Sequence, residues 1–165
     1  MRITDRLKVE HGVFLVQLRH LEQMVTARAP APALMAAIET IAEAEAHHSA
    51  LEDRLLYPAL AGKLGADSPA LHAITADHQQ IQRLLAGIRA GEPDPESVLQ
   101  LVTTLRDHME REIHDVFVLA EDVLPEAELH SMCNWDVQHI FEESGNEALW
   151  MERLLHLPKS EPPSH

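Results

Sequence analysis

The chain has 165 residues, of which 45% are hydrophobic, so it is long enough for one domain with a substantial core. Its formal net charge of −14 makes nucleic acid and anionic membranes unfavourable partners. The N-terminal residues include many charges and no apolar run reaches the length of a membrane span, which predicts a cytoplasmic protein with no membrane association.

Apolar residues recur at intervals of three and four almost throughout the chain, which is the spacing of amphipathic helices. The first predicted helix covers residues 4–27 and ends before the Ala-Pro-Ala-Pro segment at 29–32. The second begins near Ala33 and ends near Pro58. The apolar stripe predicted for the first helix consists of Leu7, Phe14, Leu15, Leu18 and Val25.

Two residue pairs predict where the next helices begin. Ser68-Pro69 and Asp94-Pro95 each place a good N-cap residue directly before a proline that suits the first helical turn. The third helix therefore begins at Pro69, and the fourth runs from Pro95 to about residue 124, with Val116 and Leu119 on its apolar face. Four long helices with short connections predict an all-α fold, an antiparallel up-and-down four-helix bundle.

The sequence after Pro125 predicts a short C-terminal helical extension. It contains both tryptophans, Trp135 and Trp150, and is followed by a polar tail. We therefore assign residues 1–124 to the bundle, 125–157 to an extension packed on it and 158–165 to a flexible tail. The aromatic side chains of the extension either cap one end of the core, which we prefer, or form a homodimer or partner surface.

Histidine is unusually abundant, with 12 residues against a single cysteine, Cys133. A lone cysteine excludes an internal disulfide and a thiolate cluster, so a metal ion would be held by imidazole and carboxylate groups. One histidine falls on the apolar stripe of each predicted helix: His11, His48, His78 and His108.

Two glutamates extend this histidine pattern. Glu52 follows His48 by four residues and Glu112 follows His108 by four, so each pair shares one helix face. Similar numbers of residues separate His11 and His48 from the turn between them, and the same holds for His78 and His108. The side chains within each half are therefore predicted at one level, and the two halves share that level if the second helix ends near Pro58.

Each of these features is weak when taken singly. A lone histidine on an apolar face is more often a core residue than a ligand, and the His-x-x-x-Glu spacing also occurs by chance. A third match, His139 with Glu143, is predicted to be a decoy because its face is partly hydrated. However, four imidazoles and two carboxylates in one core layer are costly unless cations compensate them. The other histidines are predicted to lie at the surface or boundary: His20, His47, His72, His114, His130 and His156.

The order and spacing of these residues resemble the hemerythrin-like, or HHE cation-binding, domain over residues 5–124. The resemblance rests on His11, on the segment from His48 to Pro58, on Asp77-His78 and on the segment from His108 to Glu112. It implies a four-helix bundle with a non-haem di-iron centre. Ile74 and Ile113 stand where oxygen-carrying hemerythrins have a histidine and an aspartate. The chain therefore resembles the four-His, two-Glu branch rather than the oxygen carriers.

The resemblance also implies a chemistry. If Glu52 and Glu112 both bridge, each metal ion has two histidine nitrogens and two glutamate oxygens, with positions left for a bridging oxygen and a small ligand. The expected cofactor is a pair of oxo- or hydroxo-bridged iron ions, with manganese or zinc as alternatives. The expected ligands are dioxygen, peroxide or nitric oxide. Three hypotheses follow: a di-iron protein that binds or senses a small oxidant or iron, which we prefer; a redox or iron-repair enzyme at the same centre; and a metal-free helical adaptor.

Two residues near the predicted centre have open roles. Glu45 shares the face of His48 and Glu52, so it is either an extra ligand or a partner of a ligand. Glu45 and His48 form the one match to the Glu-x-x-His pattern of ferritin-like proteins that fits the site. Tyr57 is interpreted as a boundary residue near a helix end rather than a redox or hydrogen-bonding neighbour.

Overall fold

The structure, a computed structural model, describes residues 1–65 and 67–134, and the described residues contain helices and no strand. The all-α prediction is therefore confirmed. Helices with the α-helical repeat are labelled α and π-helical turns are labelled η. In chain order they are α1 (Ile3–Thr26), α2 (Ala31–Leu51), η1 (Glu52–Leu56), α3 (Tyr57–Leu64), α4 (Pro69–Arg89), α5 (Pro95–Arg111), η2 (Glu112–Val116) and α6 (Phe117–Val123).

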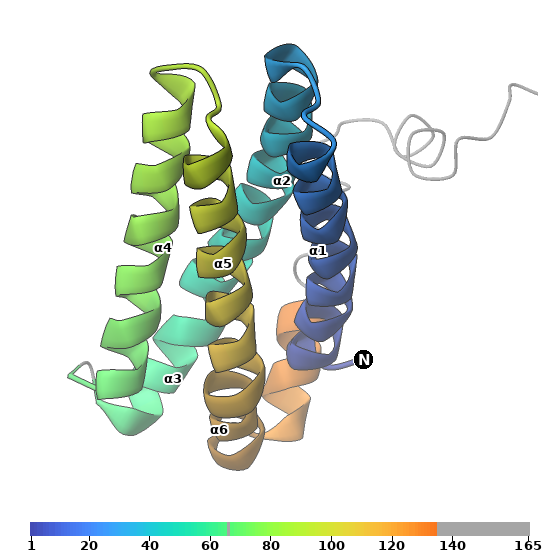
Figure 1. Cartoon of the computed structure of the whole chain (residues 1–165). Coiled ribbons are helices and arrows are strands. Elements are labelled where there is room, and N and C mark those ends of the chain that lie inside the picture. The colour runs from blue at the N-terminus through green and yellow to red at the C-terminus, as the bar shows by residue number, and fades with distance from the viewer. Residues whose placement is uncertain (66, 135–165) are drawn as a thin grey trace, which may run out of the picture.

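The helices form an antiparallel bundle (Figure 1). α2, η1 and α3 follow one another directly and make one continuous helical segment, as do α5, η2 and α6. Together with α1 and α4 they give the four segments of an up-and-down bundle. α1 packs against α2 and α5, and α4 packs against α5.

Prolines and one aspartate determine where the helices begin. Pro69 and Pro95 lie in the first turn of α4 and α5, as predicted. The Asp94 carboxylate accepts hydrogen bonds from the backbone N–H groups of Glu96 and Ser97, both at 3.0 Å, whereas the Ser68 side chain makes no such bond. α2 begins two residues earlier than predicted, because a proline is tolerated in a first helical turn, where its missing N–H has no partner to lose.

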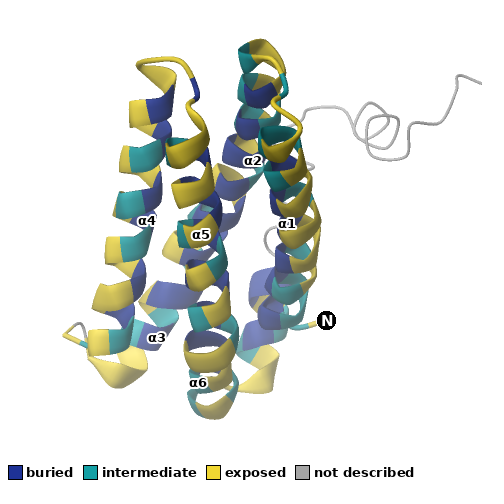
Figure 2. Ribbon diagram, in the orientation of Figure 1, coloured by how far each residue is buried: buried dark blue, intermediate teal, exposed yellow. Residues whose placement is uncertain are grey.

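The core is divided into two apolar clusters along the bundle axis. One cluster includes Phe14, Leu18 and Ile81, and the other includes Leu7, Leu56 and Phe117. His11 lies between Leu7 and Phe14 in sequence, so it occupies the level between the clusters. Figure 2 shows the buried residues following the inward sides of all four segments.

The two π-helical turns were not predicted, and they change which residues face the core. A π-helical turn contains one extra residue, so the side chains after it rotate by roughly 100° relative to a continuous α-helix. After η2 the buried positions are Phe117 and Ala120, while Leu119, predicted on the apolar face, is only half-buried. Leu15 was also wrongly placed on the core stripe, since it is 43% exposed.

Residues 126–134 are helical and pack at the base of the bundle. Leu129, Met132 and Cys133 are buried in the same cluster as Ile3 and Leu7. The rest of the predicted extension and the tail, including Trp135, His139, Phe141, Glu143 and Trp150, lie outside the described residues. Among the described helices, none combines the length and apolar character that crossing a membrane requires.

Candidate metal centre

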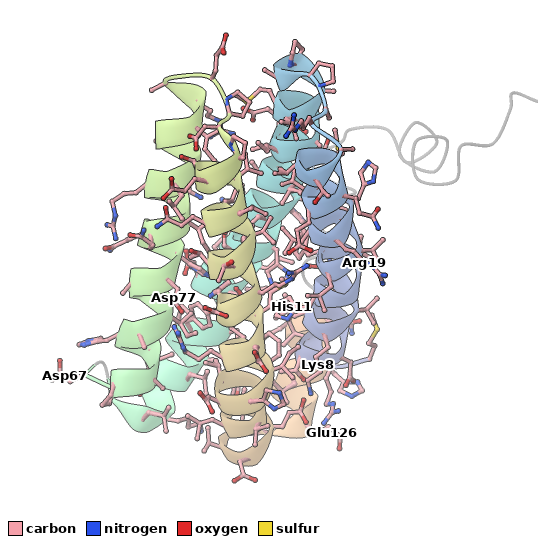
Figure 3. The ribbon with its side chains drawn as sticks, viewed as in Figure 1. Lys8, His11, Arg19, Asp67, Asp77 and Glu126 are labelled. Atoms are coloured by element: carbon pink, nitrogen blue, oxygen red, sulfur yellow. The ribbon has the colours of Figure 1, made fainter. Side chains whose placement is uncertain are left out.

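The six residues selected from the sequence lie together at mid-height in the bundle. α1 carries His11, α2 carries His48 and α4 carries His78, and Figure 3 shows His11 at this level of α1. α5 carries His108, while Glu52 and Glu112 are the first residues of η1 and η2. All six are buried, and both glutamates have no exposed surface.

The ligand atoms form two groups of four that share both glutamates. One group contains His11, His48, Glu52 and Glu112, and the other contains Glu52, His78, His108 and Glu112. Within each group the ligand atoms lie within 4.8 Å of one another. The Nε2 atom of each histidine faces a carboxylate: His11 and His108 lie 3.2 and 3.3 Å from Glu112 Oε2, and His48 and His78 lie 3.4 and 3.5 Å from Glu52.

Several buried oxygen and nitrogen atoms at this level lack hydrogen-bond partners and are placed to bind metal ions. Both carboxylate oxygens of Glu52, Oε2 of Glu112 and Nε2 of His78 are buried without a hydrogen-bond partner among the described residues. An unpartnered buried polar atom costs about 1–3 kcal/mol, and a buried charge costs more. Cations held between these nitrogens and oxygens would remove this cost.

Carboxylates lie behind three of the four imidazole rings. Nδ1 of His48 lies 2.7 Å from Glu10, Nδ1 of His78 lies 3.5 Å from Asp53 and Nδ1 of His108 lies 3.7 Å from Asp77. Of the three, only Glu10 is hydrogen-bonded to its imidazole, so it holds a proton on Nδ1 of His48 and directs Nε2 toward the ligands, whereas Asp53 and Asp77 make no hydrogen bond to Nδ1 of His78 or His108. For His11, no described residue accepts a hydrogen bond from Nδ1.

Glu10 and Asp77 follow a simple sequence rule, and neither was predicted to lie behind an imidazole. Each immediately precedes the ligand-candidate histidine of its own helix and lies behind the ligand-candidate histidine of the next helix. Glu10 is also paired with Arg6 at 2.9 Å, and Asp77 is paired with Arg111. An acidic residue directly before a histidine on an inward-facing stripe is the signal that would have identified both.

Tyr57 belongs to the centre, contrary to its interpretation as a boundary residue. Its hydroxyl donates a 2.5 Å hydrogen bond to Oε1 of Glu112, and the residue is 8% exposed. The π-helical turn η1 lies directly before Tyr57 and rotates it inward. Burial and the charges of Glu52 and Glu112 raise the pKa of Tyr57 well above its usual value, so the phenol keeps its proton.

The metal-free centre distributes its protons unevenly. Burial, together with repulsion from Glu52, raises the pKa of Glu112 well above its usual value. Burial and the neighbouring His48 lower the pKa of His11 to about 3. Burial opposes the charged form of His48 as well, but the hydrogen bond to Glu10 and the nearby carboxylate of Glu52 raise the pKa of His48 to about 10. Without metal, therefore, His48 holds a proton at neutral pH, and the carboxyl of Glu112 is harder to ionise than an exposed one.

Glu45 lies next to the centre but outside both groups of ligands. It is 4% exposed, its Oε1 has no hydrogen-bond partner among the described residues, and its Oε2 accepts a 3.4 Å hydrogen bond from Gln82. Burial raises its pKa. This placement favours a partner near the ligands over an extra ligand.

The two isoleucines and the described histidines outside the centre are not metal-ligand candidates, as predicted from the sequence. Ile74 is fully buried and Ile113 is half-buried. An isoleucine side chain has no atom that can bind a metal ion, so neither position supplies a further ligand. The described histidines predicted at the surface or boundary are exposed or half-buried: His20, His47, His72, His114 and His130. His156 and the decoy pair His139 and Glu143 lie outside the described residues.

Comparison with known proteins gives one match. A family model described as the hemerythrin HHE cation binding domain matches residues 2–120. Searches of curated proteins and of solved structures found no match. The matched residues include all six side chains of the two groups.

Proposed function

The chain belongs to the hemerythrin HHE cation-binding domain family, and from this premise we propose that it is a non-haem di-iron protein that binds or senses a small oxidant or iron. The observation that carries the proposal is the pair of four-residue groups that share Glu52 and Glu112. Each group offers two imidazole nitrogens and two carboxylate oxygens, a donor set that suits iron, with manganese and zinc as alternatives.

The residues of the chain prepare the centre for such a pair of ions. Glu10 orients the imidazole of His48 through a 2.7 Å hydrogen bond at Nδ1, which directs Nε2 toward the other ligand candidates. The two apolar clusters exclude bulk water on either side. Bound iron would supply redox chemistry and coordination positions for dioxygen, peroxide or nitric oxide.

One contact favours the second candidate function, a redox or iron-repair enzyme at the same centre. Such an enzyme needs a proton donor near the reacting atoms, and the sequence alone did not identify one. The Tyr57 hydroxyl, held 2.5 Å from Glu112, is a buried donor in the required place. Catalytic turnover of peroxide by the iron-loaded protein, lost in Tyr57→Phe, would favour the enzyme over a binding or sensing protein.

Iron stoichiometry tests the proposal. The protein is loaded with ferrous iron without oxygen, desalted, exposed to air and assayed for iron and for near-ultraviolet absorption of a bridged diferric centre. We expect two irons per chain, and fewer in His108→Ala and Glu112→Ala. The control His72→Ala removes an exposed histidine and should keep both. A wild-type protein that binds no iron, or one ion that His108→Ala does not affect, would contradict the proposal and favour the metal-free adaptor.

A further inference from the structure

The two halves of the bundle repeat the same pattern of ligands. α1 and α4 each carry one ligand-candidate histidine, and α2 and α5 each carry such a histidine followed four residues later by the glutamate that begins a π-helical turn. The halves differ in polarity beside these ligands. Three positions of the first half are polar, and the equivalent positions of the second half, counted from His48 and His108, are apolar. The polar residues are Glu45, Ser49 and Asp53, and their counterparts are Leu105, Met109 and Ile113.

The polar residues lie on the side of their helical segment that faces α4. Glu45 accepts a hydrogen bond from Gln82 of α4, and Asp53 lies 3.5 Å from His78 of α4. Ser49 is four residues from each of them and is buried, so it lies on the same side between them. We call these three residues, with His78 and Gln82, the polar seam.

The polar seam is also the more open side of the centre. The His78 side chain is 10% exposed, whereas that of His11, its counterpart, is 1% exposed. The Asp53 side chain is 57% exposed and Gln82 is exposed, so polar groups lead from solvent to the ligands. α2 packs less closely against α4 than α1 packs against α5.

Buried polar atoms in the polar seam lack partners. Oε1 of Glu45 and Nδ1 of His78 are buried and make no hydrogen bond to any described residue. A carboxylate in such a position is unfavourable for stability unless something else interacts with it. The carboxylate oxygens of Glu45 are suitable ligands for a divalent cation that passes through the polar seam.

We infer that the polar seam is the route by which divalent metal ions enter the centre, and that His78 and His108 receive the first ion. This inference rests on the proposed function. Asp53 attracts the hydrated cation at the surface, and Glu45 coordinates or hydrogen-bonds its remaining water inside the seam. We call the equivalent side of the second half, with Leu105 and Met109, the apolar side. Its buried side chains offer no oxygen ligand to an entering cation.

The kinetics of Co²⁺ binding test the route. Stopped-flow absorption of bound Co²⁺ gives the rate of uptake, competition with EDTA gives the rate of release, and titration gives the stoichiometry. The double variant Glu45→Leu with Asp53→Ile copies the residues of the apolar side. We expect it to bind two Co²⁺ per chain, with uptake and release both at least about tenfold slower. Its melting temperature should be unchanged or higher, because a buried carboxylate is removed.

Two further variants make the test decisive. Leu105→Met with Ile113→Val alters the equivalent positions of the other side and should keep wild-type rates. Asp53→Asn keeps the shape of the side chain and should slow uptake by a smaller factor than the double variant does. It tests the route if the double variant does not fold. Wild-type rates in the seam variants, equal slowing in the control, or loss of a Co²⁺ at equilibrium would each overturn the route. A wild-type protein that binds no Co²⁺ and no iron would instead contradict the proposed function.

Discussion

Tyr57 is not one of the six ligand candidates, but its hydroxyl donates a hydrogen bond of only 2.5 Å to the carboxylate of Glu112. Tyr57→Phe removes the donor and leaves a buried carboxyl oxygen unsatisfied. We expect the metal-free variant to lose about 1–3 kcal/mol of unfolding free energy, measured by urea denaturation, while two irons still bind. A variant as stable as the wild type would mean that the hydrogen bond contributes nothing to the fold.

Protonation of single residues also determines how metal affinity depends on pH. Without metal, His48 has a pKa of about 10 and holds a proton at pH 7, and the raised pKa of Glu112 makes its carboxyl harder to ionise. Metal ligation needs neutral imidazole and ionised carboxylate, so binding must release the protons that these groups hold. Apparent affinity should therefore rise with pH from 6 to 9. Co²⁺ titrations across this range measure it, and an affinity independent of pH would show that these groups are not ligands.

At the scale of the helices, the caps before α4 and α5 offer a matched comparison. Asp94 accepts hydrogen bonds from two backbone N–H groups, and Ser68, at the equivalent position, accepts none. Asp94→Ala should therefore lower the free energy of unfolding more than Ser68→Ala does. Urea denaturation of the two variants measures the difference. Equal losses would contradict the role assigned to the Asp94 carboxylate.

The number and order of the long helices could be predicted from apolar spacing, but the π-helical turns could not. Spacing of three and four residues looks the same before and after an inserted residue, so the prediction continued each helix without a break. Leu119 was therefore placed in the core, and Tyr57 was placed at the boundary, although the structure buries Tyr57. The rotation that a single extra residue gives to the side chains after it turns Leu119 away from the core and Tyr57 toward it.

At the scale of the whole molecule, the site was easier to predict than its surroundings. Each ligand candidate lies on an inward stripe, and counting residues from the turns places them at one level, which depends only on helix geometry. The carboxylates behind the imidazoles depend on side-chain contacts between helices. Asp53 and Asp77 reach histidines on other helices, and sequence spacing within one helix does not reveal this.

The bundle as a whole supports the centre by placing it between two separate cores. Residues on either side, such as Leu18 and Leu56, are fully buried, so the polar layer is enclosed by apolar packing. Metal ions bound there would connect all four helical segments. Two ions held by the two groups of ligand candidates would share Glu52 and Glu112.

Magnetic coupling between the two irons tests this claim most directly. The protein is loaded with ⁵⁷Fe, oxidised in air and measured by Mössbauer spectroscopy at liquid-helium temperature in an applied field. Two ferric ions bridged within one centre are coupled, so we predict a diamagnetic ground state for both irons. Spectra of isolated, paramagnetic ferric ions would show that the ions do not share the glutamates and would contradict the account.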